Sequence, residues 1–131
     1  MVFSGSFLNV SDNSGGTIVK CIKVYGPKKH QFGGIGDVIL VSIRKYIPIQ
    51  RQKTQINKKK KVIKSQIYKG VIVRVKHWTR RKGEIVSFGD NAVVLLKNEN
   101  NFLFTRVFGP VGMELRKKGW SKILLLASMI V

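Results

Sequence analysis

Residues 70–96 decide the fold, and they read G-V-I-V-R-V-K-H-W-T-R-R-K-G-E-I-V-S-F-G-D-N-A-V-V-L-L. The β-branched run at 71–75 predicts a largely buried strand, because branched side chains pack well on a pleated surface. Ile85, Val86 and Phe88 resume the strand pattern. The segment Gly89-Asp90-Asn91 predicts a hairpin turn into a third apolar strand at 92–96. We therefore expect a three-stranded meander.

A cationic loop separates the first two of these strands. Within residues 76–83, four Lys and Arg residues and His77 surround Trp78. Arg80 and Arg81 follow on a turn fixed by two strands, so we expect both guanidinium groups to face solvent. Arginine suits bidentate contact with phosphate and stacking on bases. This arrangement is that of a nucleic-acid-binding module, not of a catalytic cleft.

The whole chain is strongly basic, with 25 Lys and Arg against 6 Asp and Glu and a net charge of +19 over 131 residues. Such a charge attracts polyanions, and nucleic acid is the expected partner. A membrane surface would prefer an amphipathic helix with cations on one face, and the sequence shows none. The length predicts one domain, residues 1–131.

Several common features are missing from the sequence. Cys21 is alone, so we expect no disulfide and no cysteine zinc site. The longest apolar run, at 123–131, is too short to span a bilayer. No signal or transit peptide is visible.

Residues 44–82 hold 15 of the 25 cations and no acid. Within them, residues 50–65 are poor in apolar side chains and carry four consecutive lysines at 58–61. We expect this stretch to be disordered alone and to fold on RNA, with a flexible surface loop as the alternative.

Further strands are predicted on both sides of the central stretch. Residues 7–10 and 17–25 form two of them, joined by S-D-N-S-G-G, in which Asp12 is expected to form the turn. Residues 38–43 form another, after a glycine-rich turn that lacks the Lys-Ser/Thr of a phosphate-binding loop. Residues 102–108 predict a last strand, ended by Gly109-Pro110.

The C-terminal segment has the features of a short helix at 111–118. Glu114 lies in its first turns, cations lie in its last, and Gly119 follows as the C′ residue. Trp120 and residues 123–126 supply a last apolar segment, helix or strand, that should pack back onto the strands.

No residues suggest catalysis, and no cofactor or metal is implied. The three Asp residues lie beside Gly or Asn in turns, and no pair of carboxylates is suited to acid–base work. His30 and His77 lie in separate basic loops without ligand spacing.

Ten motifs, in order and with near-family spacing, resemble one family, the universal large-subunit ribosomal protein L-fourteen. They are L-N-V-S-D-N-S-G-G at 8–16, C-I-K-V at 21–24, G-I-G-D-V-I at 34–39, I-P at 47–48, G-V-I-V-R-V-K at 70–76, R-R at 80–81, D-N-A-V-V-L-L at 90–96, T-R-V-F-G-P-V at 105–111, E-L-R at 114–116 and K-I-L-L-L-A at 122–127.

The resemblance implies a mainly β protein: a small closed five-stranded β-barrel at about 1–110, with a short helical C-terminal segment at about 111–131. It implies a structural constituent of the large ribosomal subunit that binds large-subunit rRNA at the subunit interface and supports assembly and bridging to small-subunit rRNA. The implied protein neighbours are of the L-three and L-nineteen families. A ribosome-silencing factor would dock at Thr105, Arg106 and Lys122.

Two sets of candidate site residues follow. The RNA-binding candidates lie in the basic segments: Lys28, Lys29, His30, Arg44, Lys45, Arg51, Lys53, Lys58, Lys59, Lys60, Lys61, Lys64, Arg74, Lys76, His77, Trp78, Arg80, Arg81 and Lys82. The protein-contact candidates are Thr105, Arg106, Phe108, Arg116 and Lys122.

The sequence departs from the family pattern in three places. A long basic insertion occupies about 49–69, Lys82-Gly83 replaces an acid-glycine pair, and Phe104 replaces a glycine next to the silencing-factor segment. Lysine outnumbers arginine 18 to 7, and Ile, Asn and Phe are plentiful, as an AT-rich gene would give. These features favour a mitochondrial ribosome, with a bacterial cytoplasm or a plastid as alternatives.

A free single-strand-binding barrel of the OB type is the alternative function. It needs several aromatic side chains on one exposed face to stack bases, and only Trp78, Tyr25 and Tyr68 look free. An enzyme is the third hypothesis, which no residue pattern supports.

Overall fold

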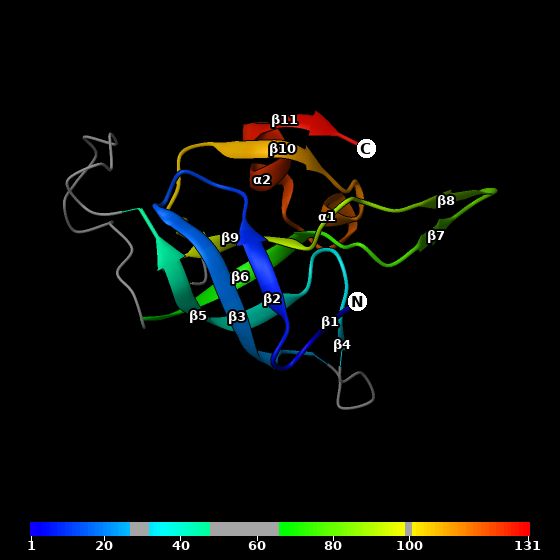
Figure 1. Cartoon of the computed structure of the whole chain (residues 1–131). Helices are drawn as coiled ribbons and strands as arrows, with labels where there is room; N and C mark the ends of the chain where they lie inside the picture. Colours follow the sequence, from blue (N-terminus) through cyan, green and yellow to red (C-terminus); the bar gives the residue numbers. More distant parts are fainter. Residues whose placement is uncertain (27–31, 48–65, 99–100) are drawn as a thin grey trace.

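The computed structural model describes residues 1–26, 32–47, 66–98 and 101–131 (Figure 1). In this part of the chain a closed barrel has the strand order β2-β3-β5-β6-β9. Its strands are β2 (Phe7–Val10), β3 (Gly16–Val24), β5 (Val38–Tyr46), β6 (Ile67–Arg74) and β9 (Ala92–Leu96). β2 closes the barrel by pairing in parallel with β9, whereas the other neighbours are antiparallel. The expected five-stranded barrel is confirmed.

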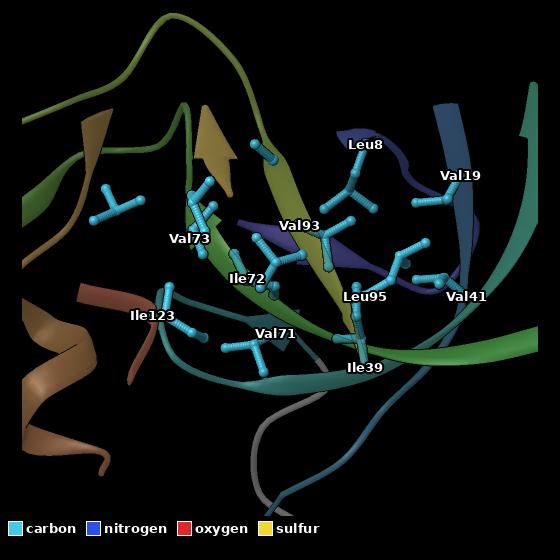
Figure 2. Packing of buried hydrophobic residues seen from close by; sticks show 14 of the residues in the cluster. Leu8, Val19, Ile39, Val41, Val71, Ile72, Val73, Val93, Leu95 and Ile123 are labelled. Carbon is cyan, nitrogen blue, oxygen red and sulfur yellow. The ribbon is translucent and has the colours of Figure 1, made fainter. Parts of the chain in front are cut away.

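The barrel has apolar layers on both faces of β6. Successive side chains of a strand point to opposite faces. Figure 2 shows Ile72 among the residues inside the barrel, whereas Val71 and Val73 lie toward Ile123 of the C-terminal part. All four of these side chains are fully buried. Because both faces are covered at residues 71–73, this part of β6 is an uninterrupted apolar run in the sequence.

The predicted three-stranded meander is wrong. β6 pairs directly with β9, and β9 has β2 on its other side, so no hydrogen-bonding edge of β9 is left for residues 84–88. Those residues instead take part in a separate hairpin of β7 (Thr79–Arg81) and β8 (Glu84–Val86). The segment Gly89-Asp90-Asn91 is therefore a bend between the hairpin and the barrel, not a hairpin turn.

The last predicted strand is shifted along the chain. β10 is Val107–Val111 and runs through Gly109-Pro110, and Phe102 makes only an isolated bridge with Leu96. Gly109 has φ +74 and the pairing of β10 is irregular there. A proline has no backbone N–H to donate and is tolerated in edge strands. Because β10 belongs to a two-stranded sheet and is therefore an edge strand, Pro110 destabilises it little.

The C-terminal part folds back beside the barrel. α1 is Glu114–Lys117, shorter than the predicted helix, and Gly119 follows it with φ +84, as expected. The apolar segment that was open between helix and strand begins with α2 (Ser121–Leu126) and continues as β11 (Ala127–Ile130), which pairs in parallel with β10. In the described residues no helix is long and apolar enough to cross a membrane.

A second small sheet lies at the other side of the hairpin base. β1 (Val2–Phe3) and β4 (Phe32–Gly33) pair in an antiparallel way, and the rings of Phe3 and Phe32 are 6.0 Å apart. Figure 1 shows this sheet below the start of the hairpin and α1 above it. The basic residues 50–65, expected to fold on RNA, lie outside the described residues.

Candidate nucleic-acid interface

The hairpin β7–β8 projects from the barrel (Figure 1). Thr79 pairs with Val86, Arg80 with Ile85 and Arg81 with Glu84. Lys82 and Gly83 form the turn, and Gly83 has φ +72, a conformation that glycine adopts at little cost. Side chains alternate along β7, so Arg80 and Arg81 point to opposite faces of the hairpin. Arg80 and Lys82 are exposed, as expected.

Arg81 was predicted to face solvent, and this prediction is wrong. Its Nε donates to Glu114 Oε1 at 2.6 Å, and its Nη2 donates to Glu114 Oε2 at 2.9 Å and to the carbonyl of Val131 at 2.7 Å. The side chain is only 15% exposed. The prediction failed because the sequence did not show that α1 packs beside β7. Arg81 braces the hairpin against the C-terminal part.

The pKa values at this ion pair reflect its geometry. The bonds to Glu114 raise the pKa of Arg81 above its usual value. Burial alone would raise the pKa of Glu114, but the bonds from Arg81, a backbone hydrogen bond and nearby positive charge together outweigh it, so that pKa is lowered. Both groups are therefore charged at neutral pH.

Arg74 is also engaged within the protein. Its Nε donates to Asp90 Oδ1 at 2.9 Å, and its Nη1 donates to the carbonyls of Phe108 and Pro110 at 3.1 and 3.2 Å. Only 11% of its side chain is exposed. Arg74 thereby ties β6 to the bend before β9 and to β10, and its guanidinium is not presented to a phosphate.

The base of the hairpin carries the remaining candidates of this region. Lys76, His77 and Trp78 are exposed, and Trp78 is the most exposed aromatic side chain among the described residues, at 69%. The backbone N–H of Lys76 donates to Asn91 Oδ1 at 2.8 Å, which fixes the point at which the chain leaves the barrel. A cluster of exposed basic and aromatic side chains therefore spans the hairpin from its base to its tip.

Other RNA-binding candidates lie elsewhere. Arg44 and Lys45 are exposed near the end of β5, at the opposite end of the barrel from the hairpin (Figure 1). The structure therefore does not bring them together with the hairpin cluster. The candidates outside the described residues are Lys28, Lys29, His30, Arg51, Lys53, Lys58, Lys59, Lys60, Lys61 and Lys64.

Asn13 holds the segment predicted to contact proteins. Its Nδ2 donates to Thr105 Oγ1 at 2.7 Å, and its Oδ1 accepts from the backbone N–H groups of Thr105 and Arg106 at 2.9 and 3.2 Å. Phe104 is buried and packs on Phe102 with ring centroids 4.9 Å apart. The phenylalanine that replaces the family glycine therefore points away from the exposed surface of Thr105 and Arg106.

The other protein-contact candidates are also exposed, namely Phe108 on β10, Arg116 on α1 and Lys122 on α2.

Asp12 has the structural role that its turn predicted. It is buried, and it accepts hydrogen bonds from the backbone and hydroxyl of Ser14 and from the backbone N–H of Leu95. It thus joins the turn after β2 to β9. Burial raises the pKa of Asp12 to about 6, although its hydrogen bonds act in the opposite direction.

The two tyrosines that looked free in the sequence have internal partners. The ammonium groups of Lys23 and Lys69 lie 5.3 and 5.2 Å from the ring centre of Tyr25, within cation–π range. The hydroxyl of Tyr68 donates to Gln66. Of the three candidate stacking residues only Trp78 is exposed, whereas Tyr25 and Tyr68 are half-buried.

Sequence reasoning missed Lys117 as a neighbour of the hairpin. Its position in the last turn of α1 indicated only an interaction with the helix dipole, whereas the structure places it beside Trp78 and Arg80 around one hollow. No local signal could have revealed this, because the contact depends on how α1 packs.

The family model described as ribosomal protein L14p/L23e matches residues 1–131. The chain belongs to this family. L14p/L23e proteins are structural proteins of the large ribosomal subunit and not enzymes, so the chain's place is the ribosome. The resemblance drawn from the ten motifs is confirmed.

Proposed function

We propose that this L14p/L23e protein binds large-subunit rRNA directly through the hairpin cluster, which we define as Lys76, His77, Trp78, Arg80 and Lys82. The observation that carries the proposal is the exposure of these side chains on a hairpin that the Arg81–Glu114 ion pair holds against α1. A braced hairpin loses little freedom on binding, so more of the contact energy appears as affinity.

The charge distribution supports the same partner. Cations on the hairpin attract phosphates, and Arg80 can contact a phosphate through two N–H groups. Arg44 and Lys45 on β5 would contact rRNA elsewhere, since β5 ends at the opposite end of the barrel. Residues 1–131 thus act as one domain with contacts at both ends.

We further infer that the protein lies at the subunit interface, where it supports assembly and bridging to small-subunit rRNA. The exposed Thr105 and Arg106, fixed by Asn13, and Lys122 on α2 form the proposed protein-contact surface together with Phe108 and Arg116. Its proposed partners are neighbours of the L-three and L-nineteen families and a ribosome-silencing factor.

The composition favours a mitochondrial ribosome. A Lys-rich, Arg-poor basic content and the long basic insertion both fit an AT-rich organelle gene. Localisation of the tagged protein in its native cell would separate this location from a bacterial cytoplasm or a plastid.

The test of the function is sedimentation of cell extract. We expect the native protein to travel with large subunits at moderate salt, and Arg80→Glu to shift it toward the top of the gradient or to reduce the large-subunit peak. Lys97→Glu makes the same kind of charge change at an exposed site outside the hairpin cluster and is the control. Purification of most of the protein away from ribosomal particles would instead favour a free single-strand-binding barrel.

A further inference from the structure

A hollow of about 460 Å³ lies where the base of the hairpin meets α1 and β4. Its lining includes the apolar side chains of Val75, Trp78, Phe32 and Ile35 and the cations Arg80 and Lys117. The volume falls within the roughly 300–1,000 Å³ of pockets that hold small ligands. It is large enough for a flat aromatic group with attached polar atoms.

Trp78 gives this hollow an exposed aromatic face. The side chain is 69% exposed, although burial of an indole is strongly favourable. It lies on the short segment between β6 and β7, where the bond from Lys76 N–H to Asn91 and the pairing of β7 fix the backbone on both sides. A rigidly held, exposed tryptophan is suited to stacking against a planar ligand.

The charges around the hollow favour an anionic ligand. Arg80 and Lys117 both line it, and no ion pair within the described residues engages either of them. Glu114 is the acidic residue in its wall, and Arg81 neutralises it through two hydrogen bonds. Lys118, also in the wall, is paired with Asp37. The unpaired charge of the lining is therefore positive.

A ligand that is planar and apolar on its face and anionic at its edge matches this site. We propose that the hollow receives a single unpaired nucleotide of the rRNA, with its base stacked on Trp78 and its phosphates held by Arg80 and Lys117. An unpaired base has a free face, whereas a base inside a duplex is stacked on both sides. The inference rests on the proposed function and specifies which RNA feature the hairpin recognises.

The test compares three RNA hairpins with the full-length protein. One carries a single bulged adenosine, the second carries an abasic nucleotide at the same bulge, and the third is fully paired. The first two have the same charge and differ only in the base. We expect the wild-type protein to bind the bulged adenosine at least about fivefold more tightly than the abasic RNA, the lower end of what one base–aromatic stack contributes.

Three variants assign this preference to Trp78. Trp78→Ala should bind both bulged RNAs alike, and Trp78→Phe should keep part of the preference. Ile85→Ala changes another exposed apolar site, 60% exposed, on the same hairpin but outside the hollow, and should keep all of it. Quenching of tryptophan fluorescence by the adenosine should disappear in Trp78→Ala. The other tryptophan, Trp120, does not line the hollow, and its indole N–H donates to the carbonyl of Gly36 at 3.0 Å. A thermal melt checks that each variant folds.

Equal affinity of the wild-type protein for the bulged and abasic RNAs would overturn the inference. So would a preference that survives in Trp78→Ala. In either case, salt-dependent binding of all three RNAs and sedimentation with ribosomes would leave the proposed function standing. If the wild-type protein neither binds rRNA nor sediments with ribosomes, both the inference and the proposed function are overturned.

Discussion

Arg81 and Glu114 lie 33 residues apart in sequence and form a two-bond ion pair that joins the hairpin to α1. Arg81 also bonds the carbonyl of Val131, so one side chain ties together β7, the first short helix and the end of the chain. Its neighbour Arg80 points to the opposite face and is exposed. Two adjacent arginines therefore differ in their surroundings: Arg81 positions the hairpin, whereas Arg80 is open to solvent and is the proposed RNA contact.

The first prediction separates these two tasks. Arg81→Ala should lower the free energy of unfolding by about 1–3 kcal/mol, because it removes charge-assisted hydrogen bonds and leaves Glu114 half-buried without its partner. Arg80→Ala should change it by less than about 0.5 kcal/mol, as is usual for an exposed site. Urea denaturation of the two variants provides the measurement. Equal stability of the two variants would show that the ion pair does not brace the hairpin.

The same contrast shows what the sequence could and could not reveal. The β-branched run at 71–75 and the apolar run at 92–96 predicted buried strands, because such side chains pack well on a pleated surface. The partners of those strands were not visible. Nothing local indicates that β9 pairs with β2 in parallel and thereby excludes residues 84–88 from the barrel. Strand existence is a local property, whereas strand order depends on the whole chain.

The residues of the candidate site also differ in whether the sequence could predict their surroundings. Exposed Arg80, Lys82 and Trp78 could be predicted, because a basic turn with an aromatic residue indicates a presented loop. The engagement of Arg74 and Arg81 could not, since their partners Phe108, Pro110 and Glu114 lie 33 to 36 residues away in sequence. The sequence shows that a residue is charged but not which charges meet.

The second prediction concerns pH and Asp12. Burial raises the pKa of this carboxyl from 3.8 to about 6, so between these values the folded protein binds a proton that the unfolded chain has lost. This contribution to stability is fully present below about pH 4 and is lost as pH rises through about 6. The contribution of Asp12 to the free energy of unfolding should therefore fall by about 1–3 kcal/mol across that range.

The Asp12→Asn variant isolates this effect, because its side chain does not titrate. Asp90 and Glu114 act in the opposite sense: burial would raise each pKa, but their hydrogen bonds and ion pairs lower it, so their contributions are lost as pH falls. Both carboxyls are present in the wild type and in the variant, and they cancel in the difference. Urea denaturation between about pH 3.5 and 7 should therefore give curves that differ in slope. Parallel curves would contradict the assignment to Asp12.

The third prediction concerns the contact between β6 and β9 at Gly70. A Cβ added to Gly70 would lie 2.6 Å from Val93 Cγ2 and 3.1 Å from the carbonyl oxygen of Val94. Because one of these atoms is backbone, the strands would have to separate, so Gly70→Ala should cost about 1–3 kcal/mol, as other overpacked cores do. Gly89→Ala is the control, since its Cβ would meet nothing within 4 Å. A melting temperature equal to that of the control would mean that the barrel adapts at this position.

The last prediction concerns the salt dependence of rRNA binding. Each phosphate neutralised by a cation releases counterions, so the logarithm of the affinity falls by roughly 0.7–0.9 per decade of salt for each such contact. Arg80→Gln and Lys82→Gln should each reduce this slope by about one contact and weaken binding at low salt, because both side chains are exposed and have no ion-pair partner within the described residues. Lys97→Gln, exposed outside the hairpin cluster, should leave the slope unchanged. Filter binding of a large-subunit rRNA fragment over a series of salt concentrations measures the slopes. If the slope falls equally in all three variants, the charge of the whole protein and not the hairpin cluster determines the electrostatic part of binding.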